Sequence, residues 1–123
     1  MLTISRILIG LIAALHFYIA YFEIFAWETR GPQVFSTFPQ ELFSQTIELA
    51  ANQGIYNAFL AAGLIWALTI TDRAWQRNVA TCFLLFVMVA GMMGAITVSP
   101  RILIVQTIPA LIAALFLWRP ARQ

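Results

Sequence analysis

Charged side chains are scarce in this sequence, and one basic residue type is missing. Only 10% of the 123 residues are charged, whereas a soluble domain carries about 25%. Lysine is absent, so arginine supplies all seven basic side chains. The arginines are scattered, and this excludes the basic patch of a nucleic-acid-binding protein. With 62% hydrophobic residues, a globule of this size cannot bury its apolar surface. The composition therefore predicts an integral membrane protein.

Cysteine and histidine each occur once. The single cysteine, Cys82, excludes an internal disulfide and a site built from several cysteines. A metal site needs three or four convergent donors, and only His16, Glu23 and Glu48 are candidates. We therefore predict no metal site, and the residues identify no cofactor.

Four apolar runs predict the architecture. They cover Leu2–Trp27, Leu49–Ile70, Val79–Val98 and Ile102–Trp118. As helices they are ~25–38 Å long, enough to cross a hydrocarbon core of ~30 Å. We predict an all-α fold, in which residues 1–123 form a single four-span transmembrane domain, an integral membrane four-helix up-down-up-down bundle.

The connections between the runs differ in length. Glu28–Glu48 is the long one, with a break expected at Arg30-Gly31-Pro32. Within it, Pro39–Leu49 is expected to form a short helix that lies at the membrane interface or leads straight into the second span. Thr71–Asn78 and Ser99–Arg101 are expected to be tight polar turns between antiparallel neighbours.

The arginines predict the orientation of the bundle. Five of them fall on one side of the expected spans and two on the other. By the positive-inside rule, both termini are then cytoplasmic and the long connection is external. The five are Arg6, Arg73, Arg77, Arg119 and Arg122, and the two are Arg30 and Arg101.

Ala14–Trp27 is an apolar segment of helix length that carries two titratable side chains. His16 and Glu23 are seven residues apart, so on a helix they share nearly one face, ~10 Å from each other. Ionisable groups within a membrane span are costly and usually mark a functional site. The segment is therefore the first candidate for such a site.

Polar residues of other spans fall at a similar depth, in the outer half of the predicted bundle. We expect them to line one pocket, because polar groups in lipid turn inward. Pro109 is expected to free a backbone carbonyl and kink the fourth span nearby. Two structural interpretations stay open. The amides could form interhelical contacts, and Glu23 could extend to the outer interface or pair with Arg30. The predicted pocket residues are His16, Glu23, Trp27, Asn52, Gln53, Tyr56, Asn57 and Gln106.

Three segments carry a family resemblance. HFYIAYFEIFAWE (16–28), LAANQGIYNAFLAAGLIW (49–66) and QTIPALIAALF (106–116) resemble the bacterial domain-of-unknown-function 1304 family. The resemblance implies a small integral membrane protein with four spans in the bacterial inner membrane. It implies no activity.

Three classes of function stay open. The first, which we favour, is a protein that binds a small apolar or amphipathic molecule, such as a quinone-, sterol- or lipid-like compound, among the aromatic residues around His16. The second is a membrane enzyme that uses His16 and Glu23 as an acid–base pair. The third is a small proton-coupled transporter, for which a homo-oligomer is the natural form. All three have the lipid bilayer as a partner.

Overall fold

Four rods make up most of the molecule. The computed structural model describes Met1 and residues 3–119. Three rods are the long helices α1 (Thr3–Phe25), α4 (Ile47–Thr69) and α5 (Arg73–Thr97). The fourth, the η1–α6 rod, joins the π-helix η1 (Leu103–Thr107) to α6 (Ile108–Trp118). The described part contains no strand, so the all-α prediction is confirmed.

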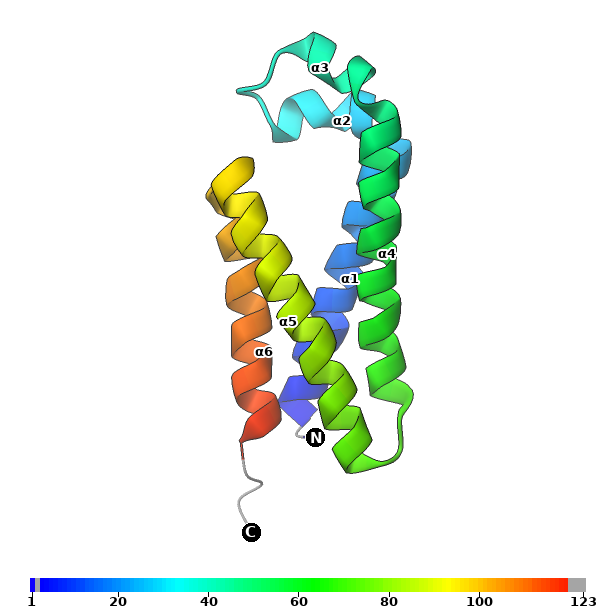
Figure 1. The fold of residues 1–123 in the computed structure, drawn as a ribbon, viewed down its shortest axis with the longest axis vertical. Coiled ribbons are helices and arrows are strands. Elements are labelled where there is room, and N and C mark those ends of the chain that lie inside the picture. The colour runs from blue at the N-terminus through cyan, green and yellow to red at the C-terminus, as the bar shows by residue number, and fades with distance from the viewer. Residues whose placement is uncertain (2, 120–123) are drawn as a thin grey trace.

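Each rod packs against two others. α1 contacts α4 and α6, and α5 contacts α4 and the η1–α6 rod. Successive rods run in opposite directions, so α1 begins and α6 ends at the same end of the molecule (Figure 1). α1 and α5 are long and apolar enough to cross a membrane. α4 is as long as α1, but amides in its first turns lower its hydropathy. Crossing by all four rods stays a prediction.

The turn between α4 and α5 is shorter than predicted. α5 begins at Arg73, so most of the expected turn Thr71–Asn78 is helical. Asp72 caps the helix, because its side chain accepts a hydrogen bond of 2.7 Å from the backbone N–H of Trp75. The Gln76 side chain also donates to the carbonyl of Ile70, at 2.9 Å. These polar residues form a helix start rather than a loop.

Two short helices fill the long connection. They are α2 (Trp27–Val34) and α3 (Gln40–Gln45), which pack against each other beyond one end of the rods (Figure 1). The short helix predicted within Pro39–Leu49 is present as α3, whereas the break predicted at Arg30-Gly31-Pro32 is wrong, since α2 continues through it. Pro32 removes only one backbone donor, and Phe35 still donates to the Gly31 carbonyl at 2.8 Å.

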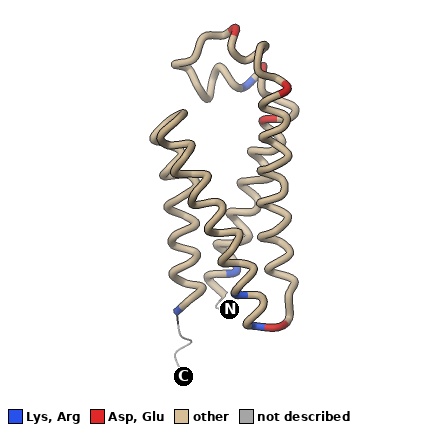
Figure 2. Tube along the Cα trace, in the orientation of Figure 1, with Lys and Arg blue, Asp and Glu red and all other residues tan. Residues whose placement is uncertain are grey.

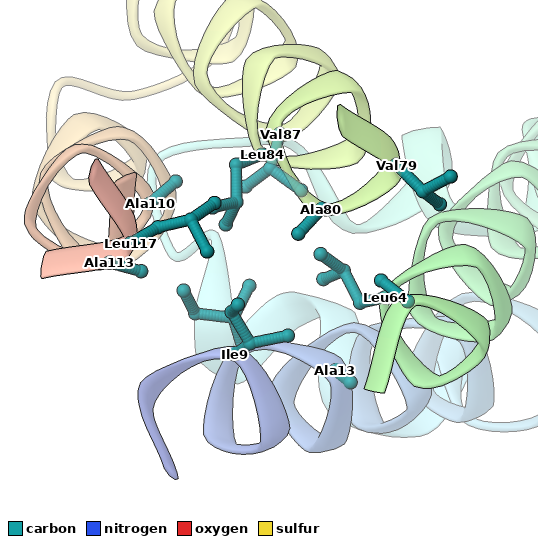
Figure 3. Close-up of a cluster of buried hydrophobic side chains, with 12 residues drawn as sticks. Ile9, Ala13, Leu64, Val79, Ala80, Leu84, Val87, Ala110, Ala113 and Leu117 are labelled. Carbon is teal, nitrogen blue, oxygen red and sulfur yellow. The ribbon is translucent and has the colours of Figure 1, made fainter. Parts of the chain in front are cut away.

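The rods pack tightly over only part of their length. Figure 3 shows buried apolar side chains from all four rods meeting near the end where α1 begins. Toward the other end, α5 leans away from α4 (Figure 1). The labelled residues of this core include Ile9, Ala13, Leu64, Leu84, Ala110 and Leu117.

Charge is concentrated at the two ends of the molecule, and the length between them carries very little (Figure 2). We call the end where α1 begins the arginine end, and the end with α2 and α3 the cap end. Arg122, one of the arginines used to predict orientation, lies outside the described residues. The described charged residues at the arginine end are Arg6, Asp72, Arg73, Arg77 and Arg119, and those toward the cap end are Glu23, Glu28, Arg30, Glu41, Glu48 and Arg101.

Candidate functional site

A hydrogen bond joins α1 to α4 near the cap end. The Asn57 side chain donates from Nδ2 to Oε2 of Glu23, at 2.8 Å. The two helices come close there because Gly54 lies against Ala20 and Ile24. A Cβ at Gly54 would lie only 3.0 Å from the Ala20 carbonyl oxygen. The small residue thus brings the amide within reach of the carboxylate, and both side chains are half-buried.

A cavity lies beside this pair. The α4–α5 cavity has a volume of about 500 Å³ and is bounded by α4 on one side and α5 on the other. Glu23 and Asn57 line it together with apolar residues such as Leu60 and Met93. A volume of 300–1,000 Å³ is typical of a small-molecule site.

Glu23 also lines a second cavity. The α1–η1 cavity has a volume of about 340 Å³. Leu15 and Ile19 of α1 line it opposite Ile102 and Val105. Its wall is mainly apolar, with Ser99 and Arg101 among its polar members.

Four residues line both cavities, and we call them the junction. Two are polar and two are apolar. Glu23 and Gln106 therefore contribute polar side chains to the walls of both cavities. The junction consists of Glu23, Phe35, Ile102 and Gln106.

An irregular turn places Gln106 at the junction. Residues 103–107 form a π-helix, whose register is shown by the N–H of Ile108 bonding to the carbonyl of Leu103. Pro109 follows directly and has no N–H, so the ordinary α-helical bond to the carbonyl four residues earlier is not made. The helix beside Gln106 is therefore irregular in the form of a π-helix, a feature often found at functional sites. The kink predicted there stays a prediction.

A glycine on α5 brings η1 close to that helix. A Cβ at Gly91 would lie 2.9 Å from the Cβ of Gln106 and from the backbone nitrogen of Thr107. The Thr107 hydroxyl donates to the carbonyl of Met88 at 3.1 Å. These contacts fix the η1 segment that carries Gln106.

Aromatic side chains connect the short helices α2 and α3 at the cap end to the junction. Trp27 packs on Phe22, Phe35 and Phe43 with ring centroids 5.6, 6.0 and 5.3 Å away. Its indole N–H donates to the Thr46 hydroxyl at 2.9 Å. The cluster therefore ties α2 to both flanking rods and positions Phe35, which the sequence reasoning missed. Phe35 is an aromatic residue within a long polar connection, and this placement could have indicated its role from the sequence.

Six of the eight predicted pocket residues line the α4–α5 cavity. Asn52 and His16 line neither cavity. Asn52 lies on the exposed side of α4, because Gly54 and Asn57 turn the opposite face toward α1. The six are Glu23, Trp27, Gln53, Tyr56, Asn57 and Gln106.

His16 is instead fully buried in the packed part of the molecule. Its Nδ1 lies 2.8 Å from the carbonyl of Ile12. Because a carbonyl only accepts, Nδ1 carries the proton of this bond. Nε2 is buried without a hydrogen-bond partner among the described residues. The structure therefore does not bring His16 and Glu23 into one cavity.

The assembled groups are suited to hydrogen bonding with a ligand. Glu23 offers carboxylate oxygens, and Gln53 and Gln106 offer amide donors and acceptors. Within the described part of the chain, no three or more His, Cys, Asp or Glu side chains gather closely enough to hold a metal ion. What the site offers is an apolar space with a polar centre.

Comparison with known proteins places the chain in a family. The model of a family described as "Protein of unknown function (DUF1304)" matches residues 10–118. The chain is also 32% identical over 121 residues to the uncharacterized protein YpaA of Lactococcus lactis subsp. lactis (strain IL1403), in an alignment that covers 94% of this chain and 100% of that relative. No solved structure matches the chain significantly. The resemblance found in the three sequence segments is thus confirmed, and the chain belongs to the DUF1304 family.

Proposed function

We propose that this protein crosses the bacterial inner membrane with four helical rods and binds a small amphipathic molecule in the outer half of the bilayer. Exposed apolar side chains support the membrane placement. Phe25, Ile96 and Leu115 are 75%, 83% and 61% exposed, and large apolar residues are exposed on every rod. Soluble proteins rarely carry apolar surface on such a scale. Lipid chains would cover it.

The charges support an orientation with the arginine end in the cytoplasm. Four of the described arginines and one aspartate lie there, whereas glutamates outnumber arginines toward the cap end. Trp66, Trp75 and Trp118 are about half exposed and lie near the arginine end, as anchors at a membrane interface do. The two cavities then open in the outer leaflet.

One observation carries the binding proposal. Glu23 is a carboxylate that lines two mainly apolar cavities, and among the described residues its side-chain hydrogen-bond partner is the amide of Asn57. A carboxylate at this depth is costly, and proteins keep such groups mostly for function. Because the cavities are open and of ligand size, an amphiphile with a hydrogen-bond donor satisfies both the apolar walls and the carboxylate.

Native mass spectrometry of the protein extracted with its lipids tests this proposal. We expect a co-purified molecule on the wild type and at least tenfold lower occupancy on Glu23→Gln. The substitution keeps the shape of the side chain but removes the charged acceptor, and hydrogen bonds to charged groups contribute about 1.5–3 kcal/mol.

Glu28→Gln is the matched control, since Glu28 is exposed and lines neither cavity. It removes one carboxylate near the same end and should retain the wild-type occupancy. Wild-type protein that carries no bound molecule, or equal occupancy in all three proteins, contradicts the proposal.

A further inference from the structure

The arrangement of polar and apolar groups around Glu23 indicates the shape of the ligand. The polar junction residues Glu23 and Gln106 line both cavities. A ligand that satisfies them has its own polar group in the middle. Apolar space then extends from this group in two directions.

The two directions lead to different pairs of rods. On one side, the cavity passes between α4 and α5, along Leu60 and Ala90. On the other, it passes between α1 and η1, along Ile19 and Val105. Ala90 and Val105 are exposed, so each cavity reaches the surface that lipid would cover. The site therefore has two apolar arms.

The charges favour an uncharged polar group. Glu23 and Arg101 are the charged residues that line the cavities, and Arg101 is exposed in the link between α5 and η1. No cation lies among the described residues of the α4–α5 cavity. An anionic headgroup at the junction would face the carboxylate of Glu23, whereas Arg101 lines only the α1–η1 cavity and is exposed.

We propose that the site takes a neutral lipid with two apolar chains, whose polar centre lies at Glu23 and Gln106 and whose chains occupy one cavity each. This inference rests on the proposed binding function and specifies its ligand. A hydroxyl of the lipid donates to a Glu23 carboxylate oxygen. An ester or amide carbonyl of the lipid accepts from the side-chain N–H of Gln106.

Synthetic lipids test the inference by native mass spectrometry in one detergent. The probes are 1,2-dioctanoylglycerol, 1-octanoylglycerol and dioctanoyl phosphatidic acid at equal concentration. We expect the wild type to carry the neutral two-chain probe at least fivefold more often than either of the others. Val105→Trp fills the α1–η1 cavity and should reduce this preference to near parity. Ala90→Trp should do the same from the α4–α5 cavity.

Each blocking variant has a neighbour as its control. Ile104→Trp and Val89→Trp place the same ring on exposed residues of the same helices, outside both cavities. They should keep the wild-type preference. Circular dichroism checks that each variant is folded. If one blocking variant does not fold, the other still gives the comparison.

The outcomes separate this inference from the function on which it rests. An unchanged preference in both blocking variants, or a wild-type preference for the single-chain or the anionic probe, overturns the two-chain neutral ligand and leaves the binding function standing. A wild type that carries none of these probes but retains another amphiphile also overturns it. A wild type that carries no amphiphile at all overturns both.

Discussion

At the scale of single residues, the site depends on a carboxylate held by one amide. Asn57 donates to Glu23 and also lies 3.3 Å from the carbonyl of Gln53. The amide therefore links the carboxylate to the backbone of α4. If Asn57 is truncated, Glu23 loses its side-chain partner while its burial stays the same.

Asn57→Ala should lower the free energy of unfolding by about 1–3 kcal/mol, the usual cost of leaving the partner of a hydrogen bond buried and unsatisfied. Asn52→Ala is the matched control, because Asn52 is an exposed amide of the same helix that lines neither cavity. Its effect should stay within about 0.5 kcal/mol. Unfolding of the two purified proteins in the same detergent measures both losses. Equal losses of unfolding free energy would show that the Glu23–Asn57 hydrogen bond contributes no more to stability than an exposed amide does.

At the scale of elements, two glycines decide which helix faces meet. Gly54 sets the contact of α1 with α4, and Gly91 sets that of α5 with η1. Both contacts lie beside junction residues. The spacing of polar residues alone does not reveal which small residues are used, and for this reason Asn52 was predicted in the pocket although it lies on the exposed face of α4.

Gly91→Ala should destabilise the protein by about 1–3 kcal/mol, as overpacking usually does. The added methyl group would meet the backbone nitrogen of Thr107 at 2.9 Å, and that atom cannot move without shifting η1. Gly10→Ala makes the same change in α1, where the nearest atom is Leu68 Cδ1 at 4.0 Å. It should be neutral or stabilise by up to about 1 kcal/mol, the helix preference of alanine over glycine. Thermal unfolding of both variants measures the difference, and a neutral Gly91→Ala would mean that η1 is held less tightly than described.

At the scale of the whole molecule, much of the helical architecture could be predicted from the sequence. Each predicted apolar run corresponds to a rod, because long runs of this kind leave few alternatives to helix. The boundaries were less predictable, since the cap by Asp72 converts a polar stretch into the start of α5. The site was predictable only in part. Depth along a helix brought Glu23, Asn57 and Gln106 to one level, but it could not show that α5 leans away from α4 toward the cap end.

The orientation of the whole molecule gives a further prediction. Reporter fusions after Gln123 and within residues 31–38 should report opposite sides of the membrane, with the first in the cytoplasm. The physical reason is the excess of arginine at the end where α1 begins and α6 ends. An intermediate fusion within residues 70–72 should report the same side as the first, and an external signal there would reverse the proposed orientation.

We propose above that an amphipathic molecule occupies the space around Glu23. The most direct measurement is an experimental structure of the protein purified with its native lipids. We predict continuous density that contacts Glu23 and Gln106 and extends into both the α4–α5 and the α1–η1 cavities. Density confined to one cavity would support binding without the two-chain ligand. A structure in which α5 and η1 close on α1 and α4, with Glu23 paired only to protein side chains and no space beside it, would contradict the account.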